Sequence, residues 1–267
     1  QRSSVPALTE QAKAVQEVQA TLVMAQRFPR DEIASEAKII KACERYSFAE
    51  DALYAFPRGG EAVEGPSIRM AEMMARHWRN MDYGFKELEQ ENGRSTVQAF
   101  AWDKESNTRV MREFVVRHEI GLKGGRTKFL TDERDVYEKM ANSAQRRVRA
   151  AILELIPADI VEKAVARVKQ TLKDKDKSIP MADQITVCVR AFDTVQVSQE
   201  MIERRLKHAM KDCTVDELAA LRTIFNSLRD KLSKREDWFD FGTPTEGGKA
   251  AAVAAVANET AGQEKSK

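Results

Sequence analysis

Apolar residues recur at helical spacing through the first part of the chain. This repeat predicts helices over residues 7–27 and 31–45, because side chains three and four positions apart share one helix face. Residues 49–54 are expected to form a short helical turn or strand, and the Pro- and Gly-bearing stretch 57–65 is expected to be a loop. A third helix is predicted to begin at Pro66, since proline suits the first helical position.

After residue 80, the spacing of apolar residues changes from the helical repeat to the alternation that is typical of strands. Residues 81–89 are strand-like, and apolar and polar residues alternate over 95–102 and 109–117. Asn92-Gly93 lies between the first two runs and is a strong signal for a tight hairpin turn. The pattern therefore predicts a three-stranded antiparallel meander. The basic, glycine-bearing residues 118–130 that follow are expected to form a mobile loop.

Helical spacing returns in the second half of the chain. It predicts one long helix over 132–156 and another that starts at Pro157. Alternating Lys and Asp residues at 173–177 are typical of a solvated linker. Further on, Thr214 and Glu217 have the spacing of a capping box, in which each side chain satisfies a free backbone N–H at the start of a helix.

These patterns divide the chain into four parts. We expect a core at residues 7–172, a linker at 173–178, a small helical module at 179–241 and a disordered, Ala- and Gly-rich tail at 242–267. The fold class is α+β, with a three-stranded antiparallel meander packed against several helices.

Composition narrows the class of protein. The 267 residues include 44 Lys and Arg and 42 Asp and Glu, so the formal net charge is only +2. No apolar run approaches the roughly 20 residues of a membrane span, and no signal-peptide pattern is present. Three scattered cysteines predict neither a disulfide framework nor a zinc site, and indicate a reducing cytoplasm.

Catalytic motifs are missing from the sequence. We find no phosphate-binding loop, no metalloprotease motif and no nucleophilic serine elbow beside the three histidines. The many carboxylates are best interpreted as ion-paired helix surfaces, with a metal-dependent nuclease as the alternative. The protein is therefore expected to act by binding, without a catalytic residue, metal or cofactor.

A cluster of cations in the predicted helix 132–156 is the main functional signal. Lys139, Arg146, Arg147 and Arg149 lie within eleven residues that contain no acidic group. On a helix, positions 139 and 146 lie nearly on one line. A fixed row of cations suits a nucleic-acid phosphate backbone, whereas the alternative is an ordinary solvated face.

Other residues extend this hypothesis. The further candidate DNA-binding cations are Arg69, Lys123, Arg126 and Lys128. Aromatic side chains stack on exposed bases, and the candidates are Trp78 and Tyr137, although core packing is the stronger interpretation of Trp78.

The end of the predicted module has a separate feature. Trp238 and Phe239 stand among acidic residues and resemble a docking peptide for a partner protein. The alternative is that both aromatics fold back onto their own module.

The order of three short segments carries a family resemblance. Leu53-Tyr-Ala-Phe-Pro57 is followed by Met81-Asp-Tyr-Gly-Phe85, the meander, and the helix that holds Lys139 and Arg146. Residues 10–170 thus resemble the phage single-strand annealing proteins of the RecT/Redβ superfamily, most of all the Redβ branch. One departure is Asp51, where that branch has a basic residue.

The resemblance implies a function. Such proteins bind single-stranded DNA in a basic groove, pair it with a complementary strand without ATP, and assemble into rings or helical filaments on the annealed duplex. In that family, residues matching Lys139 and Arg146 contact the DNA backbone. The resemblance also implies that the C-terminal module recruits a partner exonuclease or the host single-strand binding protein. A non-catalytic replication or packaging scaffold is a further alternative.

Overall fold

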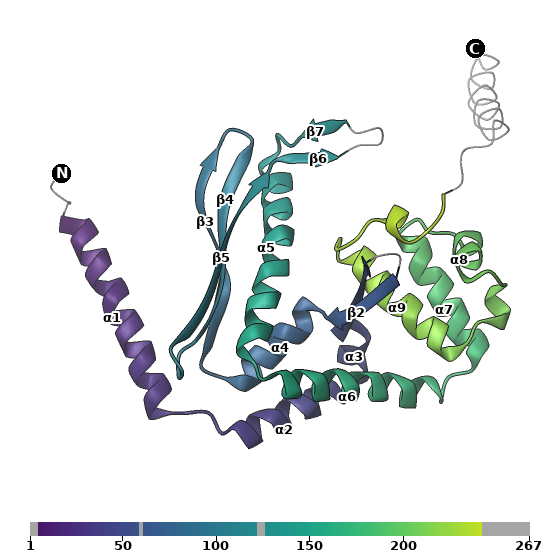
Figure 1. Cartoon of the computed structure of the whole chain (residues 1–267), viewed down its shortest axis with the longest axis horizontal. Coiled ribbons are helices and arrows are strands. Elements are labelled where there is room, and N and C mark those ends of the chain that lie inside the picture. Colours follow the sequence, from purple (N-terminus) through teal and green to yellow (C-terminus); the bar gives the residue numbers. More distant parts are fainter. Residues whose placement is uncertain (1–4, 59–60, 122–125, 242–267) are drawn as a thin grey trace, which may run out of the picture.

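The computed structural model describes residues 5–58, 61–121 and 126–241 and has a mixed α+β fold (Figure 1). The predictions for residues 1–4, 59–60, 122–125 and the tail 242–267 concern residues outside this described part. The helices before the sheet are α1 (Val5–Arg27), α2 (Glu32–Cys43), α3 (Tyr46–Ala52) and α4 (Ile68–Trp78). The predictions of helices over 7–27 and 31–45 are thus confirmed.

A short hairpin stands where the sequence predicted a loop. Strands β1 (Leu53–Arg58) and β2 (Glu61–Pro66) pair antiparallel. Pro66 therefore ends a strand and does not open α4, which corrects the sequence prediction. The side chain of Ser67 caps α4 instead, because its Oγ accepts a hydrogen bond of 3.2 Å from the N–H of Met70.

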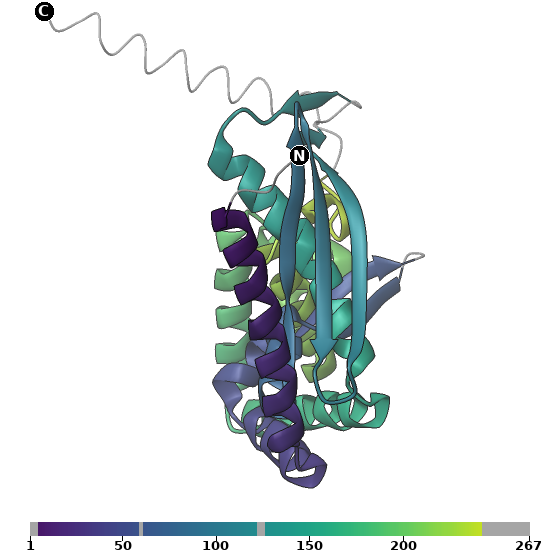
Figure 2. The same ribbon diagram turned by 90° about the vertical axis from the view of Figure 1, so that its left-hand side faces the viewer.

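The predicted meander is confirmed. Strands β3 (Met81–Glu91), β4 (Arg94–Asp103) and β5 (Thr108–Arg117) form one antiparallel sheet in that order, and Figure 2 shows them side by side. The turn between β3 and β4 contains Gly93, whose φ of 80° is easily adopted only by glycine.

One face of the sheet is covered by the predicted long helix, α5 (Glu133–Leu155) (Figure 1). Alternate residues of β4, including Val97, Ala99 and Ala101, are fully buried beneath it. Between β5 and α5, the short strands β6 (Glu119–Gly121) and β7 (Thr127–Phe129) pair antiparallel. This described part of 118–130 is therefore a hairpin and not the loop expected from its composition.

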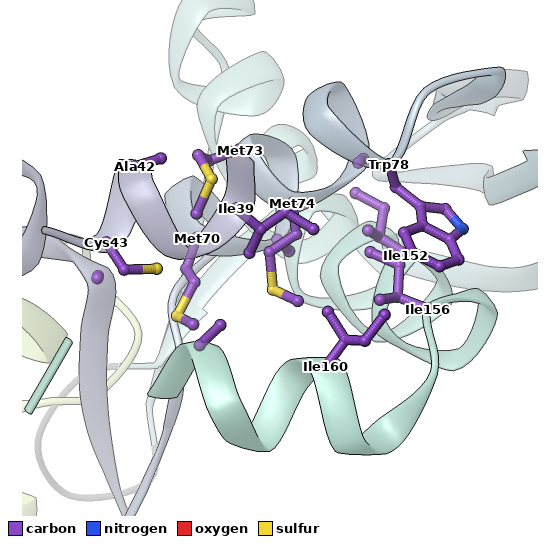
Figure 3. Packing of buried hydrophobic residues seen from close by; sticks show 14 of the residues in the cluster. Ile39, Ala42, Cys43, Met70, Met73, Met74, Trp78, Ile152, Ile156 and Ile160 are labelled. Carbon is purple, nitrogen blue, oxygen red and sulfur yellow. The ribbon is translucent and has the colours of Figure 1, made fainter. Parts of the chain in front are cut away.

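The main core gathers around α4. Figure 3 shows Met70 and Met74 of α4 packed with Ile39 of α2, Ile152 of α5 and Ile160 of the next helix. The first four of these side chains are completely buried. Since burying each such side chain stabilises the fold by roughly 1.5–3 kcal/mol, this cluster fixes α5 against the rest of the core.

The predicted linker is not a linker. Residues 173–176 are the last turn of α6 (Ala158–Asp176), a continuous helix. Asp176 is buried and accepts two hydrogen bonds of 3.1 Å from the guanidinium group of Arg222. The Lys and Asp alternation therefore marks a helix end whose final carboxylate is paired inside the protein.

The C-terminal module is helical, as predicted. Its elements are α7 (Met181–Thr194), α8 (Gln199–Leu206), α9 (Val215–Arg229) and two short 3-10 turns, η2 (Met210–Asp212) and η3 (Arg235–Asp237). The module packs on the core through β1 and α9, since Asn226 donates hydrogen bonds of 2.7 and 2.9 Å to the carbonyls of Glu50 and Leu53. Nearby, Asp51 forms an ion pair of 2.7 Å with Arg229.

The terminal aromatics do not form an exposed docking peptide. Only 5% of Trp238 and 3% of Phe239 is exposed. The indole N–H of Trp238 donates to Ser233 Oγ at 2.7 Å, and the Phe239 ring packs edge-on against Phe192 with centroids 5.5 Å apart. The docking interpretation is wrong, because two large apolar rings gain more from burial in the module core than from exposure.

The predicted capping box at the start of α9 is present and has a titrating neighbour. Glu217 accepts from the N–H of Thr214 at 2.8 Å and lies 2.9 Å from Nε2 of His208. The hydrogen bond with His208 holds the pKa of Glu217 at about 2. In turn, the hydrogen bond to Glu217 raises the pKa of His208 above its usual value.

We expect this pair to give the module a pH-dependent stability. His208 contributes fully below its unfolded-state pKa and loses its contribution as the pH rises through the raised folded-state pKa. Glu217 contributes above its usual pKa and loses this only as the pH falls toward about 2. Glu217→Gln should therefore lower the melting temperature more at about pH 6 than at about pH 9. An equal loss at both pH values in calorimetry would show that the ionic pair contributes nothing.

Candidate nucleic-acid interface

Four cations on the C-terminal two thirds of α5 have no carboxylate partner among the described residues. They are Lys139, Arg146, Arg147 and Arg149. Each side chain contacts a backbone carbonyl or an aromatic ring and forms no ion pair there. Their positive charge is therefore not cancelled at short range, as the acid-free segment predicted.

The structure separates these cations into two concave surfaces. Lys139 donates to the carbonyl of Glu119 on β6, whereas Arg146 donates to the carbonyl of Leu232 at 3.0 Å. Although positions 139 and 146 follow one line of the helix, the two long side chains turn to opposite sides. The expected single row is therefore two half-rows, one beside the sheet and one beside α9.

The first surface, here called the α5–β5 groove, lies between α5, β5 and the β6–β7 hairpin and has a volume of about 410 Å³. Lys139, Arg147 and Arg117 line it. The Arg147 guanidinium lies 3.7 Å from the ring centroid of Phe114, which holds its plane against the sheet. Among the described residues of this groove, Arg117 is the cation that forms an ion pair, with Glu119 at 3.6 Å.

The second surface, here called the α5–α9 groove, lies between α4, α5 and the end of α9 and has a volume of about 440 Å³. Its cations are Arg69, Arg146, Arg149, Arg229 and Lys231. The acidic side chains Glu72, Glu138 and Asp230 also line it.

Arg149 is a partly buried cation of the α5–α9 groove. Its guanidinium lies 4.2 Å from the ring centroid of Tyr54 on β1. Burial lowers the pKa of Arg149, and the contact with Tyr54 partly offsets this effect. An arginine remains protonated under such conditions, so Arg149 places a fixed positive charge at the floor of the α5–α9 groove.

The other predicted residues are scattered. Arg126 and Lys128 are exposed on the β6–β7 hairpin, next to the α5–β5 groove. Lys123 lies outside the described residues. Arg69 lines the α5–α9 groove but is paired with Asp230 at 2.7 Å.

The two candidate stacking residues have opposite environments. Tyr137 is 58% exposed and lines the α5–α9 groove, where a base can reach its ring. Trp78 is only 3% exposed and lies beneath Arg30, whose guanidinium is 4.9 Å from the indole. Trp78 is therefore a core residue and cannot stack on a base without unfolding, which corrects that part of the prediction.

Sequence reasoning missed three of the groove cations that come from outside α5. Arg229 and Lys231 reach the α5–α9 groove from the module, and Arg117 reaches the α5–β5 groove from β5. The excess of cations over residues 204–235 was a signal for the first two. No local pattern assigns that charge to a groove shared with α5.

Comparison with known proteins adds no further assignment. Protein-family models, curated proteins and solved structures give no match to this chain. Within the described residues, no helix has the length and apolar character required to cross a bilayer. The same residues contain no group of three or more His, Cys, Asp or Glu side chains placed to hold a metal ion.

Proposed function

We propose that this protein binds single-stranded DNA and pairs it with a complementary strand without ATP. The observation that carries the proposal is the set of four α5 cations without a carboxylate partner in the described residues, flanked by two grooves. Guanidinium and ammonium groups that have no carboxylate partner can bind phosphate oxygens through charge-assisted hydrogen bonds.

The chemistry of annealing matches a binding surface without catalytic groups. Contacts to the phosphate backbone are independent of base sequence and leave the base edges free to pair. Pairing itself releases about 1.4 kcal/mol per stacked step, so no fuel is required. A protein that neutralises the charge of two strands lowers the electrostatic barrier to their encounter.

The resemblance over residues 10–170 supports the same proposal. In this view the β3–β5 sheet, α4 and α5 form an annealing core of the RecT/Redβ type. The chain would work in the host cytoplasm as a ring or filament, so that copies of the grooves follow one another along the DNA. Recruitment of an exonuclease or the host single-strand binding protein would use the surface of the module, because Trp238 and Phe239 are buried.

A strand-pairing assay tests the proposal. Two complementary oligonucleotides, one carrying a fluorophore and the other a quencher, are mixed with the protein in EDTA and without nucleotide. We expect quenching to be faster than without protein, and the gain to shrink with added salt as counterion release weakens binding.

Other outcomes identify the alternatives. Unchanged pairing would refute the annealing function. Binding to single and double strands alike, without faster pairing, would favour the scaffold. Strand cleavage when Mg²⁺ replaces EDTA would favour the nuclease.

A further inference from the structure

The segment that follows α9 already occupies three cations of the α5–α9 groove. The Asp230 carboxylate accepts hydrogen bonds of 2.7 and 3.2 Å from Arg69 and one of 3.0 Å from Nε of Arg229. The next two residues, Lys231 and Leu232, offer their carbonyls to Arg146 at 3.3 and 3.0 Å. Residues 230–232 are here called the clasp.

The clasp presents the same chemistry as a phosphate group. A carboxylate that binds a guanidinium through both oxygens matches the geometry of arginine–phosphate pairs. The carbonyls just past a helix C-terminus also carry partial negative charge. Burial alone would raise the pKa of Asp230, but the guanidinium groups of Arg69 and Arg229 hold this pKa below its usual value. The carboxylate is thus ionised at neutral pH and competes for the same donors as DNA.

The clasp is bonded to the end of α9 through its backbone, but several of its contacts with the groove are partly exposed. Arg69 has a side chain that is 44% exposed, and Lys231, 71% exposed, is joined to Glu138 only at 3.6 Å. The Lys231–Glu138 pair is exposed on both sides and contributes little, whereas the Asp230 carboxylate is only 14% exposed and meets a partly exposed partner in Arg69. By contrast, Asn226 is 3% exposed and holds α9 on the core through two backbone carbonyls. The partly exposed Arg69 can therefore exchange the Asp230 carboxylate for a phosphate while α9 stays in place.

We propose that residues 230–232 are an autoinhibitory clasp, which occupies Arg69 and Arg146 and is displaced when the phosphates of a single strand enter the α5–α9 groove. The inference rests on the proposed function, since it assigns regulation to the same groove. A DNA strand must then compete with the Asp230 carboxylate for the groove cations, so a strand that makes few phosphate contacts does not stay bound. Opening the clasp should raise affinity, and DNA should in turn loosen the clasp.

The test compares two variants that remove the same charge. Asp230→Asn leaves Arg69 without its carboxylate. Glu36→Gln breaks a similar surface ion pair, with Lys163 at 2.9 Å, far from the groove. We expect Asp230→Asn to bind a fluorescent oligothymidylate about fivefold more tightly than the unchanged protein, and Glu36→Gln to bind it about equally. An equal rise in affinity in both variants, or no rise in Asp230→Asn, would contradict the proposed clasp.

A second measurement uses the unchanged protein and does not depend on the folding of a variant. Hydrogen exchange of the backbone amides around residues 229–235 should become faster when oligothymidylate binds, because the segment leaves the groove. Slower exchange there would mean that the segment closes over DNA, which contradicts displacement. If neither the unchanged protein nor Asp230→Asn binds the oligonucleotide, the proposed function itself is wrong. If both bind it with equal affinity, only the clasp proposal is wrong.

Discussion

Trp78→Ala is expected to destabilise the protein by about 3–5 kcal/mol, since truncating a large buried aromatic removes its burial and leaves a cavity. Trp78 is 3% exposed and is packed in the core cluster of α4 and α5 (Figure 3). The loss also exposes the apolar side of Arg30, which lies over the indole. Against a total stability of about 5–15 kcal/mol, this change should lower the melting temperature by roughly 10 °C.

Tyr137→Ala is the matched control for that measurement. Tyr137 is 58% exposed, so its truncation should leave the melting temperature nearly unchanged. If a base stacks on its ring in the α5–α9 groove, single-strand affinity should fall by about 1–3 kcal/mol. A stable Trp78→Ala protein with weakened DNA binding would reverse these assignments and restore Trp78 as a stacking residue.

The double variant Arg69→Gln/Arg146→Gln should bind single-stranded DNA on the order of 100-fold more weakly, because each charge-assisted hydrogen bond to phosphate contributes about 1.5–3 kcal/mol. The side chains line the same groove from α4 and α5. The slope of log affinity against log salt should fall by about 1.4, which is 0.7 for each lost phosphate contact. Fluorescence anisotropy over a series of salt concentrations measures both quantities.

A second double variant controls for the loss of charge. Arg112 and Arg167 form surface ion pairs with Glu154 and Glu44, outside both grooves. Arg112→Gln/Arg167→Gln removes the same charge and should retain most of the affinity and the salt slope. If the two double variants weaken binding equally, DNA is held by the net charge of the protein and not by the α5–α9 groove.

Local patterns were sufficient for most of the secondary structure. The helical repeats over α1, α2 and α5 and the alternation in β4 and β5 predicted the type of each element correctly. They did not predict burial everywhere, since Val15 and Val18 of α1 are about half exposed. The predictions failed where a segment with the composition of a loop pairs with another strand. Residues 61–66 form a strand because β1 lies beside them, although their composition is that of a loop.

The end of α6 is a second place where local composition was not sufficient to predict the structure. Charged residues at 173–177 suit a solvent-exposed linker and a solvent-exposed helix turn equally well. The helix continues because Asp176 meets Arg222 of α9, a partner 46 positions further along the chain. Trp238 and Phe239 were ambiguous for a similar reason, since only the packing of the module decides whether two terminal aromatics are covered.

The sequence by itself determined that the helix over 132–156 has an apolar face and carries cations without an acid over residues 139–149, and that three alternating runs form an antiparallel meander. These features follow from the types and spacing of residues that are close together in the chain. Only the tertiary structure decided that Lys139 and Arg146 serve different grooves, and that Asp230 reaches Arg69 across 161 positions of chain. Those contacts depend on where α9 is docked and on the direction in which long side chains turn, and neither is encoded by any local repeat.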